Sequence, residues 1–179
     1  ATLLPSYFMD YLHLSLTQMG SVLSGAGLGG VIGVLVLPAL SDRMSRKALI
    51  VFASFVQLAI LWLFSRTGAE PMALFALIMI NSFFAAGVIA VTMGPMTSAS
   101  VPNRLASSAT GLVIGCGEIF GGALAPFAAG MLVQQVGIDK LPLFAGVVTG
   151  IGFLVSLIFM KEPQRATQSP VLAQVAQER

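Results

Sequence analysis

The stretch SVLSGAGLGGVIGVLVLPALSDRMSRK, residues 21–47, contains a long apolar segment that stops at a cluster of charges. No residue from Ser21 to Leu40 is charged, and Asp42, Arg43, Arg46 and Lys47 then follow in close succession. About 20 consecutive apolar residues are enough for a helix to cross the hydrocarbon core of a bilayer. The stretch therefore predicts a membrane-spanning helix followed by a short charged loop.

The composition of the whole chain indicates the same environment. Of its 179 residues, 56% are hydrophobic and only 9% are charged, whereas a typical soluble domain carries about 25% charged residues. Because a surface that faces lipid needs no charges, we assign the chain to the integral membrane proteins. The net charge of +2 is small, and the sequence has no basic block interleaved with aromatic residues, which argues against nucleic-acid binding.

Five apolar stretches are long enough to span a bilayer: residues 18–39, 48–64, 71–94, 105–133 and 141–160. A sixth, TLLPSYFM at residues 2–9, is too short and predicts only the end of a further helix. We therefore expect an all-α, polytopic membrane helix bundle with five transmembrane helices plus the end of a sixth, from a longer polypeptide. Residues 161–179 are polar and predict a solvated tail.

The positions of the basic residues predict the orientation. Cytoplasmic loops carry an excess of Lys and Arg, and alternate loops share a side. Seven of the nine basic residues follow the first, third and fifth spans, whereas Arg66 and Lys140 follow the second and fourth. Residues 41–47, about 96–104 and the carboxy-terminal tail are therefore expected on the cytoplasmic side of the cell (inner) membrane.

In two of the spans, small residues recur every three to four positions or at seven-residue spacing, which places them on one face of a helix. Helices in lipid gain packing contacts where small residues let their backbones approach. We therefore expect Gly25, Gly29 and Gly33 of the first span to lie at helix contacts. Gly115 and Gly122 of the fourth span carry the same expectation, and Pro126 should soften or bend that helix.

The charged loop is the most specific motif. PALSDRMSRK, residues 38–47, resembles the Gly-x-x-x-Asp-Arg-x-Gly-Arg-Lys loop of the major facilitator superfamily. Asp42, Arg43, Arg46 and Lys47 match that pattern, whereas Pro38 and Ser45 stand where it has glycine. The stretches ASVPNRLASSATGL (99–112) and GCGEIFGGALAPFAAGML (115–132) are similar to the family's loop and glycine-rich helix near the end of a half, and FMKEP (159–163) to the exit of its last helix.

The resemblance implies a particular organisation. Transporters of this family have two halves of six helices, so residues 1–160 are expected to be one half without most of its first helix. The run ALFALIMINSFFAAGVIAV (73–91) lacks the arginine usual in an amino-terminal half. This favours the carboxy-terminal half, from the end of helix 7 to helix 12, whose partner is the missing amino-terminal half.

The resemblance also implies a role for the charged loop. In the family such loops latch the cytoplasmic side in one conformation, so Asp42, Arg43, Arg46 and Lys47 are expected to form a latch. Simple anchoring by positive charge on the cytoplasmic side explains the basic residues equally well, but it does not explain Asp42.

Glu118 lies in the middle of the fourth span, about 20 Å from either end at 1.5 Å per residue. A charge at this depth costs about 2.5 kcal/mol or more on insertion scales, and such residues usually face the bundle interior or a wet cavity. Three roles remain open: taking and releasing a proton, binding a polar part of a substrate, or tying helices together by hydrogen bonds. Asn81 in the third span is a second candidate for lining the cavity or for packing.

The family resemblance implies a secondary active transporter that moves a small solute by alternating access, and together with Glu118 it suggests a proton as coupling ion. An organic anion or similar metabolite is the substrate class that the family resemblance suggests. The alternative is a membrane sensor or assembly module that transports nothing. We expect no enzyme and no cofactor, because no catalytic grouping or nucleotide-binding loop is found, and no metal site, because Cys116 and His13 are the only residues of their kinds.

Overall fold

The computed structural model describes residues 3–160, apart from the side chains at positions 95, 98, 99, 103 and 159. Five of its helices are long and apolar enough to cross a membrane: Leu16–Ser41, Arg46–Arg66, Pro71–Gly94, Ala106–Val136 and Ile138–Ile158. The part of the chain that the structure describes contains no strand. The predicted all-α polytopic bundle with five spans and the end of a sixth helix is therefore confirmed.

The described elements follow one another in a simple order. They are α1 (Leu4–Ser6), η1 (Tyr7–Tyr11), α2 (Leu16–Ser41), α3 (Arg46–Arg66), α4 (Pro71–Val91), η2 (Thr92–Met96), α5 (Thr97–Ser100), η3 (Asn103–Leu105), α6 (Ala106–Gly117), η4 (Glu118–Leu124), α7 (Ala125–Val136), η5 (Ile138–Lys140) and α8 (Leu141–Phe159). The segments η1, η2 and η4 are π-helical, whereas η3 and η5 are short 3₁₀ turns.

The first two spans begin two residues earlier than hydropathy predicts, because polar caps belong to the helices. Ser15 and Gln18 form a reciprocal capping box at the start of α2. The Ser15 N–H donates to Gln18 Oε1 at 3.0 Å, and the Gln18 N–H donates to Ser15 Oγ at 3.3 Å. At the start of α3, the hydroxyl of Ser45 accepts a hydrogen bond from the Ala48 N–H at 3.2 Å. Each helix therefore begins with two residues outside its predicted apolar run, Leu16 and Thr17 in α2 and Arg46 and Lys47 in α3.

The fourth span is continuous but not regular. Its two α-helical parts, α6 and α7, are joined by the π-helical segment η4, in which the Ala125 N–H bonds to the Phe120 carbonyl. Pro126 lies two residues after the end of this segment. A proline has no N–H, and its ring crowds the carbonyl four residues earlier. That carbonyl belongs to Gly122 inside η4, so the wider turn relieves the crowding.

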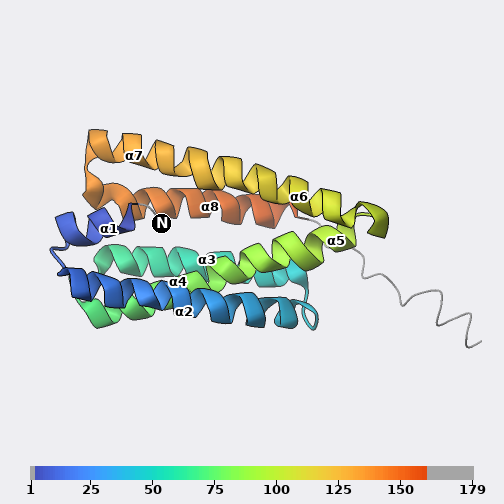
Figure 1. The fold of residues 1–179 in the computed structure, drawn as a ribbon, viewed down its shortest axis with the longest axis horizontal. Helices are drawn as coiled ribbons and strands as arrows, with labels where there is room; N and C mark the ends of the chain where they lie inside the picture. Colours follow the sequence, from blue (N-terminus) through green and yellow to red (C-terminus); the bar gives the residue numbers. More distant parts are fainter. Residues whose placement is uncertain (1–2, 161–179) are drawn as a thin grey trace, which may run out of the picture.

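The closest helix pair in the bundle is α2 with α4, which lie side by side in Figure 1. Gly25, Gly29 and Gly33 of α2 are buried in this contact. A Cβ added at Gly25 would lie 2.9 Å from the Phe75 carbonyl oxygen, and one added at Gly29 or Gly33 would collide with the α4 backbone. The glycine face is therefore what allows the two backbones to touch.

The remaining spans pack less closely. Helix α3 contacts both α8 and α4, and α7 runs along one side of α8 (Figure 1). Almost nothing in the span Ala106–Val136 is buried within the described residues. One side of the bundle is therefore an apolar face that no other described helix covers.

The loops gather at the two ends of the bundle in the alternating way that five spans require. The turn after α2, the segment α5 and the end of α8 lie at one end of Figure 1, and α1, the start of α2 and the turn before α8 lie at the other. The first end carries the segments predicted to be cytoplasmic, except for the tail at 161–179, which lies outside the described residues.

The α2–α4 contact makes a stability prediction. Gly29→Ala should destabilise the full-length protein in detergent by about 1–3 kcal/mol, because the new Cβ meets the Met79 backbone carbonyl, which cannot rotate away. The matched control is Gly27→Ala on the exposed side of α2, where nothing lies within 4 Å of the added carbon. Thermal unfolding followed by circular dichroism measures both; equal melting temperatures for the two variants would contradict the contact.

Candidate functional site

Glu118 is the first residue of the π-helical segment η4, near the middle of the fourth span. It is the only charged residue between Ala106 and Val136. Its side chain is exposed on the uncovered face, and it makes no hydrogen bond or ion pair with any residue that the structure describes. Within the described residues, this carboxyl group therefore lies near the middle of a span without a polar partner.

The carboxyl group of Glu118 folds back over its own helix at Gly122. A Cβ added at Gly122 would lie 2.7 Å from the Glu118 Oε2 atom, which is closer than a real contact allows. At Gly115 and at Gly121 the same added carbon would meet nothing within 4 Å. Within the described residues, Gly122 thus makes room for a carboxylate, and Gly115 touches no neighbouring helix.

Asn81 lies on α4 and is half-buried. It stands three residues after Ile78 and four before Ala85, so helical spacing places all three on one face of α4. Among the described residues, no hydrogen bond joins Asn81 to Glu118 or to any other group. The structure therefore does not assemble the two candidates into one site.

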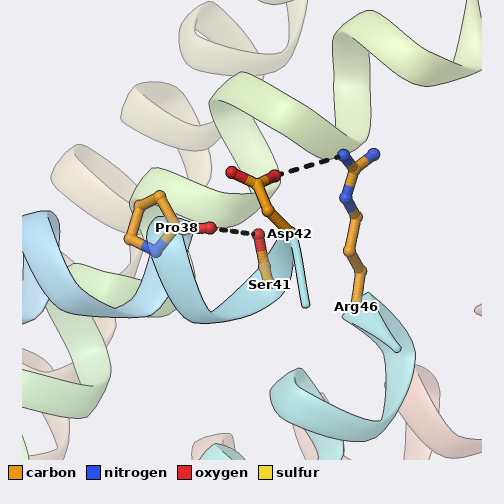
Figure 2. A network of polar contacts seen from close by, with 4 residues as sticks. All are labelled: Pro38, Ser41, Asp42 and Arg46. Carbon is orange, nitrogen blue, oxygen red and sulfur yellow. Dashed lines mark hydrogen bonds and ion pairs between the residues drawn. The ribbon is translucent and has the colours of Figure 1, made fainter. Parts of the chain in front are cut away.

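The charged loop lies at the end of the bundle where α2 passes into α3. Figure 2 shows Asp42 facing Arg46, with 3.8 Å between Asp42 Oδ1 and Arg46 Nη2. The Asp42 side chain is 68% exposed and that of Arg46 23% exposed. Ion pairs this open to solvent contribute about 0–1 kcal/mol, so the pair does little for stability. The Arg43 side chain is exposed, and that of Lys47 is half-buried.

The two departures from the family's loop pattern have local explanations. Ser45, where the pattern has glycine, serves as the N-cap of α3. Pro38, where the pattern has its first glycine, lies inside the last turn of α2, and its carbonyl accepts a hydrogen bond from the Ser41 hydroxyl at 2.7 Å (Figure 2). The turn therefore forms without either glycine.

A cavity of about 580 Å³ opens between α3, α4 and α8. Polar side chains stand among its mostly apolar walls: Ser54, Gln57, Thr92, Thr149 and Ser156. Most of these were not singled out from the sequence, because a serine or threonine inside a span can also bond to its own helix. Their placement on three different helices facing one cavity is a property of the packing.

Comparison with known proteins agrees with this architecture. The family model for the Major Facilitator Superfamily matches residues 1–177. The chain belongs to the major facilitator superfamily. The resemblance inferred from the charged loop is thereby confirmed for nearly the whole length of the chain.

Two relatives show how much of such a protein this chain represents. It is 25% identical over 156 residues to a TsgA homolog of Buchnera aphidicola subsp. Baizongia pistaciae (strain Bp), covering 87% of this chain and 39% of the relative. Its fold is similar to that of the nucleoside transporter NupG (D323A mutant), with a TM-score of 0.69 and 19% identity over 99% of this chain and 46% of that one. The chain thus spans less than half the length of both proteins.

The contact between Glu118 and Gly122 can be tested by chemical modification. Gly122→Ala should displace the carboxyl group and raise its rate of labelling by a lipid-soluble carbodiimide severalfold. It should change the free energy of unfolding by no more than about 0.5 kcal/mol, since only a flexible side chain has to move. Gly121→Ala is the matched control because its added carbon meets nothing. Mass spectrometry of the labelled full-length protein measures the rates, and identical labelling of both variants would contradict this geometry.

Proposed function

We propose that residues 1–160 form the carboxy-terminal half of a secondary active transporter of the cell membrane, in which Glu118 takes and releases the coupling proton. The observation that carries this proposal is the placement of Glu118. It is the only charged residue remote from the ends of all five spans, and it lies on the uncovered face in a π-helical segment. An acid in such a position is a functional site by default.

The irregular helix supports a functional role for this carboxyl. π-Helical turns inside α-helices are rare and occur often at functional sites. Here the π segment begins at Glu118 and ends two residues before Pro126, so this part of the span can change its turn register at small cost. A helix that adjusts around a proton-carrying group suits a protein that alternates between two conformations.

The uncovered face of the fourth span supports a two-half architecture. The large apolar side chains Leu112, Ile119, Phe120 and Phe127 are all more than half exposed along it. Since the relatives are more than twice as long as this chain, the amino-terminal half supplies the opposite wall, and the solute passes between the two halves near the midplane.

The substrate that fits this scheme is a small organic solute, and an organic anion is the first class to test. An anion that enters together with one proton carries no net charge across the membrane, so its uptake is not opposed by the membrane potential. NupG is described as a nucleoside transporter, which makes nucleosides the second class for the same assay.

The charged loop is proposed to latch the cytoplasmic end. Asp42 is largely exposed, and its carboxylate is only weakly engaged by Arg46, so it is available to groups on the other half. An ion pair with one largely exposed partner contributes little to the free energy of folding. We therefore expect the charges of the loop to affect the equilibrium between the two transport conformations more than the stability of the fold.

Glu118→Gln in the full-length protein tests the proton-carrier role. It should reduce solute accumulation driven by a pH gradient in proteoliposomes by at least about tenfold, which corresponds to about 1.4 kcal/mol. Solute exchange without a gradient should persist, because the amide preserves shape but cannot release a proton. Glu118→Asp should retain part of the driven uptake.

Glu70→Gln is the control for this substitution, since Glu70 lies just outside the membrane span at the start of α4. If Glu118→Gln accumulates solute as well as the wild type does, the proton-carrier role is wrong. If the wild-type protein moves none of the organic anions or nucleosides under any gradient, a sensor or assembly module becomes the better description.

Asp42→Asn tests the latch. The free energy of unfolding should change by less than about 1 kcal/mol, because the Asp42 side chain of this pair is 68% exposed, whereas the transport rate should fall severalfold. Asp139→Asn is the matched control, because it also removes the carboxylate of an ion pair, here with 3.1 Å between Asp139 Oδ2 and Lys140 Nζ. This pair lies in the turn before α8, at the opposite end of the bundle. A fall in rate that is equal in both variants would argue against a latch at Asp42.

A further inference from the structure

A further cavity, of about 400 Å³, lies between α2, α3 and α4 at the end of the bundle that carries the charged loop. We propose that this cavity holds an acyl chain of an anionic phospholipid, whose headgroup is bound by Arg43 and Lys47. The site is remote from Glu118, and the inference does not rest on the proposed transport mechanism.

The walls of this cavity are entirely apolar, since only leucine, methionine, alanine and phenylalanine side chains line it. Three of these side chains are aromatic: the centroid of the Phe84 ring lies 5.0 Å from that of Phe83 and 6.2 Å from that of Phe52. A polar solute would give up its hydrogen bonds to water on entering and would gain none from these walls. The occupant is therefore apolar where it contacts the protein.

The cavity opens on the outer side of α3 and α4. On α3, Phe52 lines this cavity, whereas Ile50 lines the cavity shared with α8. On α4, Phe83 and Ala85 differ in the same way. Two residues along an α-helix point about 200° apart, so the two cavities lie on opposite faces of both helices. Because the Phe52 and Met44 side chains remain 58% and 46% exposed, acyl chains of the bilayer can reach this cavity.

The depth of the cavity matches one leaflet of the membrane. It extends from Met44, in the turn after α2, back to Leu37 inside that helix. These seven residues correspond to about 10 Å along the helix axis, whereas half of the hydrocarbon core measures about 15 Å. A phospholipid with its headgroup at the level of the turn would therefore place the upper part of an acyl chain in the cavity.

Two basic residues lie next to the cavity at the level of a headgroup. Arg43 precedes Met44 in the chain and Lys47 precedes Ala48, and both of these neighbours line the cavity. The N–H groups of Arg43 and Met44 both donate to the Leu40 carbonyl at 3.1 Å, which fixes this turn against the end of α2. The charges of Arg43 and Lys47 are thus held close to the polar end of any lipid in the cavity.

The charge balance of the loop favours an anionic headgroup. Asp42, the carboxylate of the loop, faces Arg46 (Figure 2). Among the described residues, neither Arg43 nor Lys47 forms an ion pair with a carboxylate. Basic residues beside a membrane span attract anionic lipids, and guanidinium groups form strong hydrogen bonds to phosphate. A phospholipid with a net negative charge complements these two cations better than a zwitterionic one.

Photolabelling of the full-length protein tests the proposal. The protein is reconstituted into phosphatidylcholine vesicles that contain a small share of phosphatidylglycerol with a diazirine on its acyl chain. Mass spectrometry should find the peptides with Phe52 and Phe83 labelled severalfold more by this probe than by the same diazirine chain on phosphatidylcholine. Arg43→Gln should lower the preference for phosphatidylglycerol about fivefold, the effect expected of one basic residue near an anionic surface. Arg66→Gln, at the other end of α3, is the matched control and should leave it unchanged.

Filling the cavity tests the acyl-chain contact separately. Ala48 is exposed and lines the cavity, so Ala48→Trp should reduce labelling of the Phe83 peptide severalfold, because the indole takes the space of the chain. Ala59→Trp, at an exposed position farther along α3, is the control and should label like the wild type. If Ala48→Trp does not give a single peak in size-exclusion chromatography, Arg43→Gln at the exposed loop position decides alone.

Three results would overturn the proposal. Equal labelling of these peptides by the phosphatidylglycerol and phosphatidylcholine probes would mean that the headgroup is not selected. Labelling by neither probe would mean that the rest of the polypeptide or a second copy covers the cavity. An equal fall in preference for Arg43→Gln and Arg66→Gln would mean that overall surface charge, and not this site, attracts the lipid.

Discussion

The hydrocarbon core of the membrane offers no hydrogen-bond partner, and every other feature of this chain follows from that constraint. The backbone satisfies itself by remaining helical. Some hydroxyls inside the spans donate to their own helix, as Ser54 does to the Ile50 carbonyl at 2.9 Å and Ser156 to the Phe153 carbonyl at 2.7 Å, whereas the Thr110 hydroxyl donates to the Met93 carbonyl of another span at 3.4 Å. Gln57, Thr149 and Glu118 have no such bond within the described residues. Gln57 and Thr149 line the cavity between α3, α4 and α8, whereas Glu118 lies on the uncovered face of the fourth span.

Small residues show how the same composition leads to two different outcomes. In α2, Gly29 and Gly33 let the backbone of α4 come so close that no Cβ fits between them. In the fourth span, Gly115 and Gly121 lie in open space, and Gly122 accommodates only the carboxylate of Glu118. A glycine face therefore becomes a helix contact only where another helix is held against it, as α4 is held against α2.

The five spans were predictable to within three residues because hydropathy depends only on the local sequence. In a chain with 9% charged residues, an apolar run of this length is expected to form a membrane-spanning helix. The remaining errors have physical causes. Ser15 and Ser45 add polar caps before the apolar runs, and α7 continues past Val133 until Gly137, whose φ of +93° ends the helix. The family was predictable because Asp42, Arg43, Arg46 and Lys47 are recognised by their spacing, which remains informative although Ser45 and Pro38 replace the glycines.

The sequence by itself determined the membrane class, the number of spans, the family and the mid-membrane position of Glu118, because each depends on residue type and spacing along one segment. Only the tertiary structure decided which glycines touch another helix, how Glu118 lies over Gly122, and which residues line the cavity between α3, α4 and α8. The cavity and the α2–α4 contact join residues that lie on different helices and are far apart in the chain. In lipid, hydrophobicity does not choose between helix partners, so the shape of each face makes that choice.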